Sequence, residues 1–302
     1  MTHTPTGYAH HGAVRIAYDD LGGAGGDPLL LVMGMAVTRF WWPDGFVEEL
    51  IRHGFHVVCY DNRDSGQSSR FPAENAGPVT SLFRRRPPAY TAEDLTNDAV
   101  AVMDAVGWDS AHLFGHSMGG LIAQRIALGH PDRVRGLALS GSVSSDATRL
   151  QLARYIRFGR VLRIARMREA HSRVGDIALS MAVVREMASP GYPFDEREAL
   201  ARVAKDDTSP LRDVSAQGRQ LGAHWSGARL SALSVPAVVL HGEADPLLRV
   251  AAARDLAKAI TGARLVTFPG VGHELPRALW AEYAGLVQAV AASHSSGNPR
   301  GR

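Results

Sequence analysis

The chain has a single cysteine, Cys59, among its 302 residues. One thiol cannot form a disulfide within the chain, so the sequence excludes a fold held together by internal disulfide bonds. Cys59 lies in the apolar run Phe55–Tyr60, where we expect a small buried hydrophobic residue and not a nucleophile. The first five residues carry neither the basic segment nor the apolar core of a secretory signal. These features predict a cytoplasmic protein.

Long hydrophobic runs and lysine are also scarce. No stretch approaches the roughly 20 apolar residues that cross a bilayer. Lys205 and Lys258 are the only lysines, and arginine supplies the remaining positive charge, which gives a net charge of +3. The one compact basic cluster, Arg84–Arg86, precedes two prolines and has no aromatic residues interleaved, so we interpret it as a solvated loop. The sequence therefore predicts neither a membrane nor a nucleic-acid partner.

The length and the apolar content are sufficient for one large domain with an insertion, since 45% of the residues are hydrophobic. Short apolar runs alternate with helical patterns over residues 1–143 and 230–293, which predicts an α/β fold with a mostly parallel central sheet flanked by helices. Residues 144–229 lack the apolar strand-like runs and show helical patterns only, so we expect an inserted helical cap there. The Ser, Gly and Pro content of residues 294–302 predicts a disordered tail.

The first helix of the cap is expected from about Asp146 to Arg173, with an arginine at every third position. These arginines are Arg154, Arg157, Arg160, Arg163 and Arg166. A solvated stripe opposite an apolar face is the favoured interpretation. The alternative is that one or two of them bind an anionic group of a substrate.

The most informative motif is Gly115–Gly119, which reads Gly-His-Ser-Met-Gly. It follows an apolar strand, Ala111–Phe114, and precedes the helical pattern Leu121–Leu128. A serine on a sharp turn between strand and helix needs strained backbone angles, and the flanking glycines leave room for that turn. Ser117 is therefore the candidate nucleophile. A phosphate-binding loop is disfavoured, because no acidic residue closes a strand about 20 residues further on.

A serine nucleophile needs a base and an orienting acid, which in this arrangement follow it in the order Ser, acid, His. The apolar strand Val235–His241 is followed by Asp245, and the next strand, Arg264–Phe268, is followed by His273. Both side chains lie beyond the carboxyl end of a strand, the edge at which open α/β sheets place their chemistry. We predict Asp245 as the acid and His273 as the base, with Glu243 as the rival acid.

Backbone N–H groups complete the predicted site as an oxyanion hole. One donor comes from the residue after the nucleophile, here Met118, and the other from the loop after an earlier strand. Leu29–Met33 is such a strand, and the residue that we assign from its loop is Met35.

These motifs together resemble the α/β-hydrolase family over nearly the whole chain. The resemblance rests on Leu29–Ala36, Tyr60–Ser68, Gly115–Gly120, His241–Pro246 and Gly272–His273. Within the family, Val32–Met35, Trp42–Phe46 and Tyr60–Ser68 are most similar to methylesterases of anthracycline-type aromatic polyketides and to small carboxylesterases. The resemblance implies the α/β-hydrolase fold and a serine hydrolase that uses no metal and no cofactor.

We expect the substrate to be a small or medium-sized, largely apolar carboxylic ester, with a polyketide methyl ester as one candidate. Trp41 and Trp42 beside the oxyanion loop, and His116 beside the nucleophile, are the predicted pocket residues. Lactonase, thioesterase, C–C bond hydrolase and acyltransferase activities stay open, as do a lyase, a cofactor-free oxygenase and a ligand receptor, because the cap decides among them. The sequence leaves the oligomeric state open.

Overall fold

A computed structural model describes residues 7–72, 89–208 and 210–297. Over these residues, eight strands form one sheet in the spatial order β1-β2-β4-β3-β5-β6-β7-β8. β2 is antiparallel to both β1 and β4, and the other neighbouring strands are parallel. The strands are β1 Gly7–His11, β2 Val14–Gly22, β3 Asp27–Val32, β4 Phe55–Tyr60, β5 Ala111–His116, β6 Val134–Ser140, β7 Ala237–Gly242 and β8 Arg264–Phe268. The predicted α/β fold class is confirmed.

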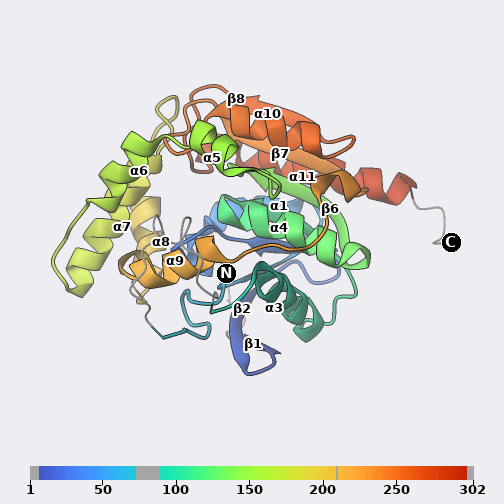
Figure 1. Cartoon of the computed structure of the whole chain (residues 1–302), viewed down its shortest axis with the longest axis horizontal. Helices are drawn as coiled ribbons and strands as arrows, with labels where there is room; N and C mark the ends of the chain where they lie inside the picture. The colour runs from blue at the N-terminus through green and yellow to red at the C-terminus, as the bar shows by residue number, and fades with distance from the viewer. Residues whose placement is uncertain (1–6, 73–88, 209, 298–302) are drawn as a thin grey trace.

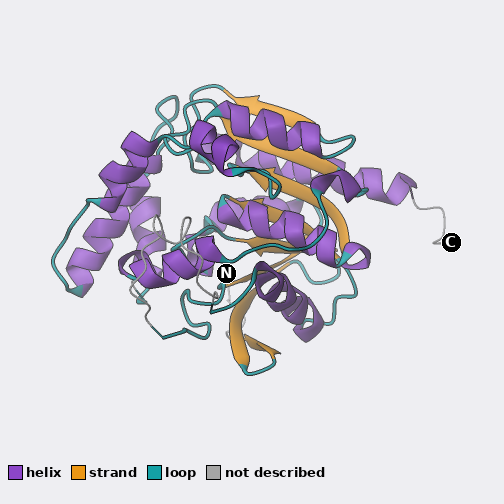
Figure 2. Cartoon of the chain, viewed as in Figure 1, coloured by secondary structure: helices purple, strands orange, loops and turns teal. Residues whose placement is uncertain are grey.

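Helices cover both faces of the sheet (Figure 2). The helices outside the cap are α1 Asp44–Arg52, α3 Ala92–Ala105, α4 Met118–Gly129, α10 Val250–Ala259 and α11 Trp280–Gly297. In β3, Leu30 and Val32 belong to the apolar cluster that includes residues of α3, α4 and α10, whereas Leu29 and Leu31 belong to a second cluster that includes residues of α1 and α11. The central strands are mostly apolar because both of their faces are buried.

The segment expected to form the cap, residues 144–229, is helical. Its described part holds five α-helices: α5 Arg149–Tyr155, α6 Phe158–Ala165, α7 Arg173–Met187, α8 Glu196–Lys205 and α9 Val214–Gly222. In Figure 1, α6 to α9 lie together at one side of the sheet, and α5 lies near α10. Tyr155, the last residue of α5, joins α5 to α10: it is buried, and its hydroxyl donates to Asp255 on α10 at 2.7 Å.

Two predicted boundaries are wrong. The single helix expected from Asp146 to Arg173 is two helices, because Ile156 pairs with Leu248 in an antiparallel bridge that interrupts the helical hydrogen bonds. At the other end, α11 continues to Gly297, into the segment expected to be disordered. Residues 298–302 and the basic cluster Arg84–Arg86 lie outside the described residues.

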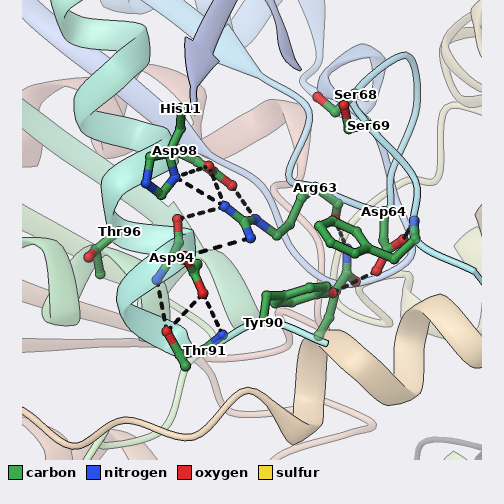
Figure 3. Close-up of polar contacts among 12 residues, drawn as sticks. His11, Arg63, Asp64, Ser68, Ser69, Tyr90, Thr91, Asp94, Thr96 and Asp98 are labelled. Atoms are coloured by element: carbon green, nitrogen blue, oxygen red, sulfur yellow. Dashed lines mark hydrogen bonds and ion pairs between the residues drawn. The ribbon is translucent and has the colours of Figure 1, made fainter. Parts of the chain in front are cut away.

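Charged side chains fasten the loop after β4 to its surroundings (Figure 3). Arg63 in this loop donates to both carboxylate oxygens of Asp98 on α3, at 2.6 and 2.7 Å, and His11 approaches the same carboxylate at 3.0 Å. The next residue, Asp64, accepts two bonds from Arg219 on α9, at 2.8 and 3.0 Å. The loop is thus tied both to the sheet domain and to the cap.

Two single positions show how local chemistry fits the fold. Thr91 caps α3 in a reciprocal capping box with Asp94, in which the side chain of each residue accepts from the backbone amide of the other. Cys59 in β4 is buried, and burial raises the pKa of its thiol, so it is protonated and inert at neutral pH. Over the described residues, no helix has the length and hydropathy needed to cross a membrane.

Candidate active site

Ser117 occupies the tight turn between β5 and α4, with φ of 57° and ψ of −122°. A positive φ is strained for a residue with a side chain and is kept only where the surroundings enforce it. They do so here by crowding: a Cβ on Gly119 would lie 1.9 Å from the carbonyl oxygen of Val32, and one on Gly115 would lie 2.5 Å from that of Gly119. The glycines of the motif therefore allow β5, α4 and β3 to meet closely behind Ser117.

The structure brings the three predicted catalytic side chains into one hydrogen-bonded chain. Ser117 Oγ lies 3.0 Å from His273 Nε2, and His273 Nδ1 lies 2.6 Å from Asp245 Oδ2. Asp245 and His273 are buried, so their attraction is weakly screened. In this arrangement Nδ1–H donates to the carboxylate, and Nε2 is left as an acceptor for the serine proton.

Asp245 is held as a carboxylate by several donors. Its Oδ1 accepts from the amides of Leu247 and Leu248 at 2.7 and 2.9 Å. Burial alone would raise the pKa of Asp245, but the attraction and hydrogen bond to His273, with the amide of Leu248, outweigh it and lower this pKa. The rival acid, Glu243, is exposed and accepts from the hydroxyl of Thr267 instead.

The loop after β3 lies against Ser117. A Cβ on Gly34 would be 3.1 Å from the Cβ of Ser117, and Met35 follows directly. Met118 is the first residue of α4, and amides of a first turn have no acceptor within their helix. The two predicted oxyanion donors, the amides of Met35 and Met118, therefore come from residues directly after Gly34 and Ser117, two residues that lie against each other.

Buried charges fix the rest of this loop. The side chain of Arg39, 2% exposed, donates to Asp19 at 2.8 Å and to Asp61, and its backbone amide donates to Asp61 at 2.8 Å. Asn62 donates to the carbonyl oxygen of Met33 at 3.0 Å. The Tyr60–Ser68 segment, which carried part of the family resemblance, thus anchors the loop that bears Met35.

The two predicted pocket tryptophans occupy different environments. Trp41 is half-buried and packs against the apolar cluster of α7 and α8 in the cap. Trp42 is 2% exposed and packs edge-on against Phe114, the ring centroids 5.7 Å apart. Trp42 is therefore a residue of the hydrophobic core, whereas Trp41 lies where the cap meets the oxyanion loop.

His116 contacts the base directly. Its ring lies 5.0 Å from that of His273, its Nε2 is 3.2 Å from the carbonyl oxygen of His273, and its Nδ1 is 3.3 Å from Ser140 Oγ. Burial, assisted by the nearby His273, lowers the pKa of His116 to about 3. A neutral His116 can donate from Nε2 and accept at Nδ1, which fits both contacts.

Sequence reasoning missed the contacts that hold the His273 loop to the cap. The amide of His273 donates to the carbonyl of Met187 at 2.9 Å, and that of Gly272 donates to Ser189 Oγ at 2.9 Å. The amide of Ser189 in turn donates to Glu274 at 2.8 Å. In the sequence, the only local indication of these contacts was the acidic residue directly after the base, Glu274.

Over the described residues, no group of three or more His, Cys, Asp or Glu side chains is placed to hold a metal ion.

Comparison with known proteins gives an independent finding about the whole chain. A family model described as the alpha/beta hydrolase fold matches residues 27–276. The rhodomycin D methylesterase DnrP of Streptomyces peucetius is 31% identical over 312 aligned residues, which cover 94% of this chain and 97% of that protein. The rhodomycin D methylesterase DauP of a Streptomyces species is 29% identical with the same coverage.

Solved structures show the same fold at lower identity. The esterase RhEst1 from a Rhodococcus species has a TM-score of 0.69 at 20% identity, with 97% of this chain and 99% of that chain covered.

Proposed function

The chain belongs to the α/β-hydrolase family, and from that premise we propose that it hydrolyses a carboxylic ester through an acyl-enzyme on Ser117. The hydrogen-bonded chain from Ser117 through His273 to Asp245 is the observation that carries this proposal. A hydroxyl alone is a weak nucleophile near neutral pH, and a neutral imidazole in contact with it supplies the base that it lacks.

The proposed reaction has two halves. Ser117 Oγ attacks the ester carbonyl while His273 Nε2 takes its proton, and Asp245 stabilises the resulting imidazolium. The amides of Met35 and Met118 would bind the oxyanion, a contribution of roughly 10²–10³ in rate for each donor. His273 then protonates the departing alcohol. Water, deprotonated by the same imidazole, attacks the acyl-enzyme and releases the acid.

We further propose that the acyl group is a bulky, ring-containing acid and the alcohol a small one such as methanol. Two methylesterases among the relatives support this substrate class, as does the apolar side chain of Trp41 beside the oxyanion loop. A rigid ring system buries apolar surface at about 25 cal/mol per Å² and loses less conformational freedom on binding than a flexible chain.

The experiment that tests this substrate class is a panel of methyl esters, with lactones included, assayed below micelle-forming concentrations. We expect kcat/KM for ring-containing acids to exceed that for long linear fatty acids by about tenfold, equivalent to about 1.4 kcal/mol. The shared methanol leaving group is the internal control. A preference for long acyl chains would contradict the methylesterase proposal, and activity on lactones alone would reassign the substrate while leaving Ser117 as nucleophile.

The pH dependence tests the base. Because a protonated imidazole cannot accept the serine proton, kcat/KM should fall as the pH is lowered from neutrality. Only one proton should be involved, because the pKa of Asp245 is lowered and that of His116 is lowered to about 3. The measurement is log kcat/KM against pH for a neutral ester, with an expected limiting slope of one.

Two profiles would contradict that assignment. A flat profile would exclude a histidine base, and a slope of two would mean that a second group titrates with it. The matched variant is His116→Gln, which should retain the slope of one even where its activity is reduced.

A further inference from the structure

A groove of about 620 Å³ lies between the start of α6 and the loop after β7. Its charged lining consists of Arg157, Arg160, Arg163 and Arg249, together with Asp245. Ser117 and the oxyanion loop are not part of this lining. Of the Ser117–His273–Asp245 chain, only Asp245 is part of the lining.

We propose that this arginine groove binds a small organic anion with at least two negative charges, carried by carboxylate or phosphate groups. The planar guanidinium fork matches both groups with two parallel hydrogen bonds. The four arginines take no part in the Ser117–His273–Asp245 chain, so the proposal does not depend on the chemistry of Ser117.

The charges of the groove are unbalanced. Glu186 lies 3.4 Å from Arg160 and 3.6 Å from Arg163, so one carboxylate is shared by two guanidinium groups. Among the described carboxylates, none forms an ion pair with Arg157 or Arg249. The four arginines of the groove therefore face only two carboxylates, those of Glu186 and Asp245. A ligand with two negative charges would balance the remaining two positive charges.

The backbone holds the two walls together in advance of any ligand. The amide of Arg157 donates to the carbonyl of Leu247 at 2.8 Å, and the amide of Arg249 donates to the carbonyl of Tyr155 at 2.9 Å. These bonds flank the bridge between Ile156 and Leu248. Because the two backbone segments are fixed, only the arginine side chains have to be ordered when a ligand binds.

The same geometry argues against a purely solvated arginine stripe. Only three of the five arginines at three-residue spacing line the groove, and the fourth, Arg249, comes from a segment far along the chain. Phe158, 56% exposed, adds a flat apolar wall, and Gly159 leaves open space beside it. A groove with charged and apolar walls fits an organic anion better than a simple inorganic ion.

Isothermal titration calorimetry on the full chain tests this proposal, with inorganic pyrophosphate as the phosphate probe and citrate as the carboxylate probe. We expect at least one probe to bind at one site per chain, with a Kd on the order of 1 mM or below, and more weakly at higher salt. Binding of pyrophosphate alone would identify phosphate as the preferred group, and binding of citrate alone would identify carboxylate.

The double variant Arg160→Gln with Arg249→Gln should weaken this binding at least tenfold. Arg254→Gln, an exposed arginine of α10 outside the groove, is the matched control and should bind like the unmodified protein. Circular dichroism verifies the fold of each variant, and Arg249→Gln alone serves if the double variant does not fold. Absence of binding by both probes, or equal binding by the double variant, would overturn the proposal.

Discussion

Replacing Ser117 by alanine is expected to lower kcat for a simple aryl ester by roughly 10⁶-fold, the loss that follows removal of the nucleophile from a serine triad. The hydroxyl is the only part removed, and His273 Nε2, 3.0 Å away, then has no proton to accept. Alanine also has a Cβ and meets the same strain at a φ of 57°. The fold should therefore be retained, and the loss should be one of chemistry.

A fluorophosphonate probe tests the same assignment without a substrate. Only a hydroxyl activated by a base beside oxyanion donors reacts readily with it, so we expect mass spectrometry to find a single adduct, on Ser117. Ser234→Ala, which changes an exposed serine before β7, is the matched control and should label normally. Labelling that persists in Ser117→Ala would mean that the nucleophile is another residue.

Local sequence patterns predicted the parts of this site that depend on neighbouring residues. The turn around Ser117 needs small residues within two positions. The strand before Asp245, β7, is buried along its whole length and is mostly apolar for that reason. The strand before His273, β8, is a partly exposed edge strand, and only part of its sequence is apolar. The parallel sheet then brings the ends of β5, β7 and β8 to one edge. Short-range sterics and strand direction therefore sufficed to place Ser117, Asp245 and His273 together.

Contacts between distant segments were not predictable in this way. The break after α5 follows from a backbone bridge between Ile156 and Leu248, and hydrogen bonds of this kind make no demand on side-chain type. The hydrogen bond from the amide of Ser189 to the carboxylate of Glu274 joins residues 85 positions apart. Trp42 was predicted to lie in the pocket from its nearness to Met35 in sequence, yet its ring turns into the core against Phe114. These features depend on tertiary packing, which the periodicity of one segment does not contain.

Replacing Asp245 by asparagine is expected to lower kcat by roughly 10⁴-fold with little change in the fold. An asparagine at this position can still accept from the amides of Leu247 and Leu248 through its carbonyl oxygen. Its amide nitrogen would then face His273 Nδ1 as a donor, where the carboxylate now accepts at 2.6 Å. The imidazole would respond by moving its proton to Nε2, and an Nε2–H cannot take the proton of Ser117.

The comparison that decides between the two acids is Asp245→Asn against Glu243→Gln, each measured by kcat on the same aryl ester and by thermal unfolding. Glu243 is exposed and bonded to Thr267, so its replacement should change kcat by less than about threefold, as expected for a surface carboxylate outside the hydrogen-bonded chain. The two variants differ from the unmodified chain by the same change of charge, which removes net charge as an explanation. A large loss in Glu243→Gln with little loss in Asp245→Asn would assign the orienting role to Glu243. A large loss in Asp245→Asn, with its melting temperature retained, would instead place the effect on the tautomer of His273, because the buried carboxylate contacts the base directly.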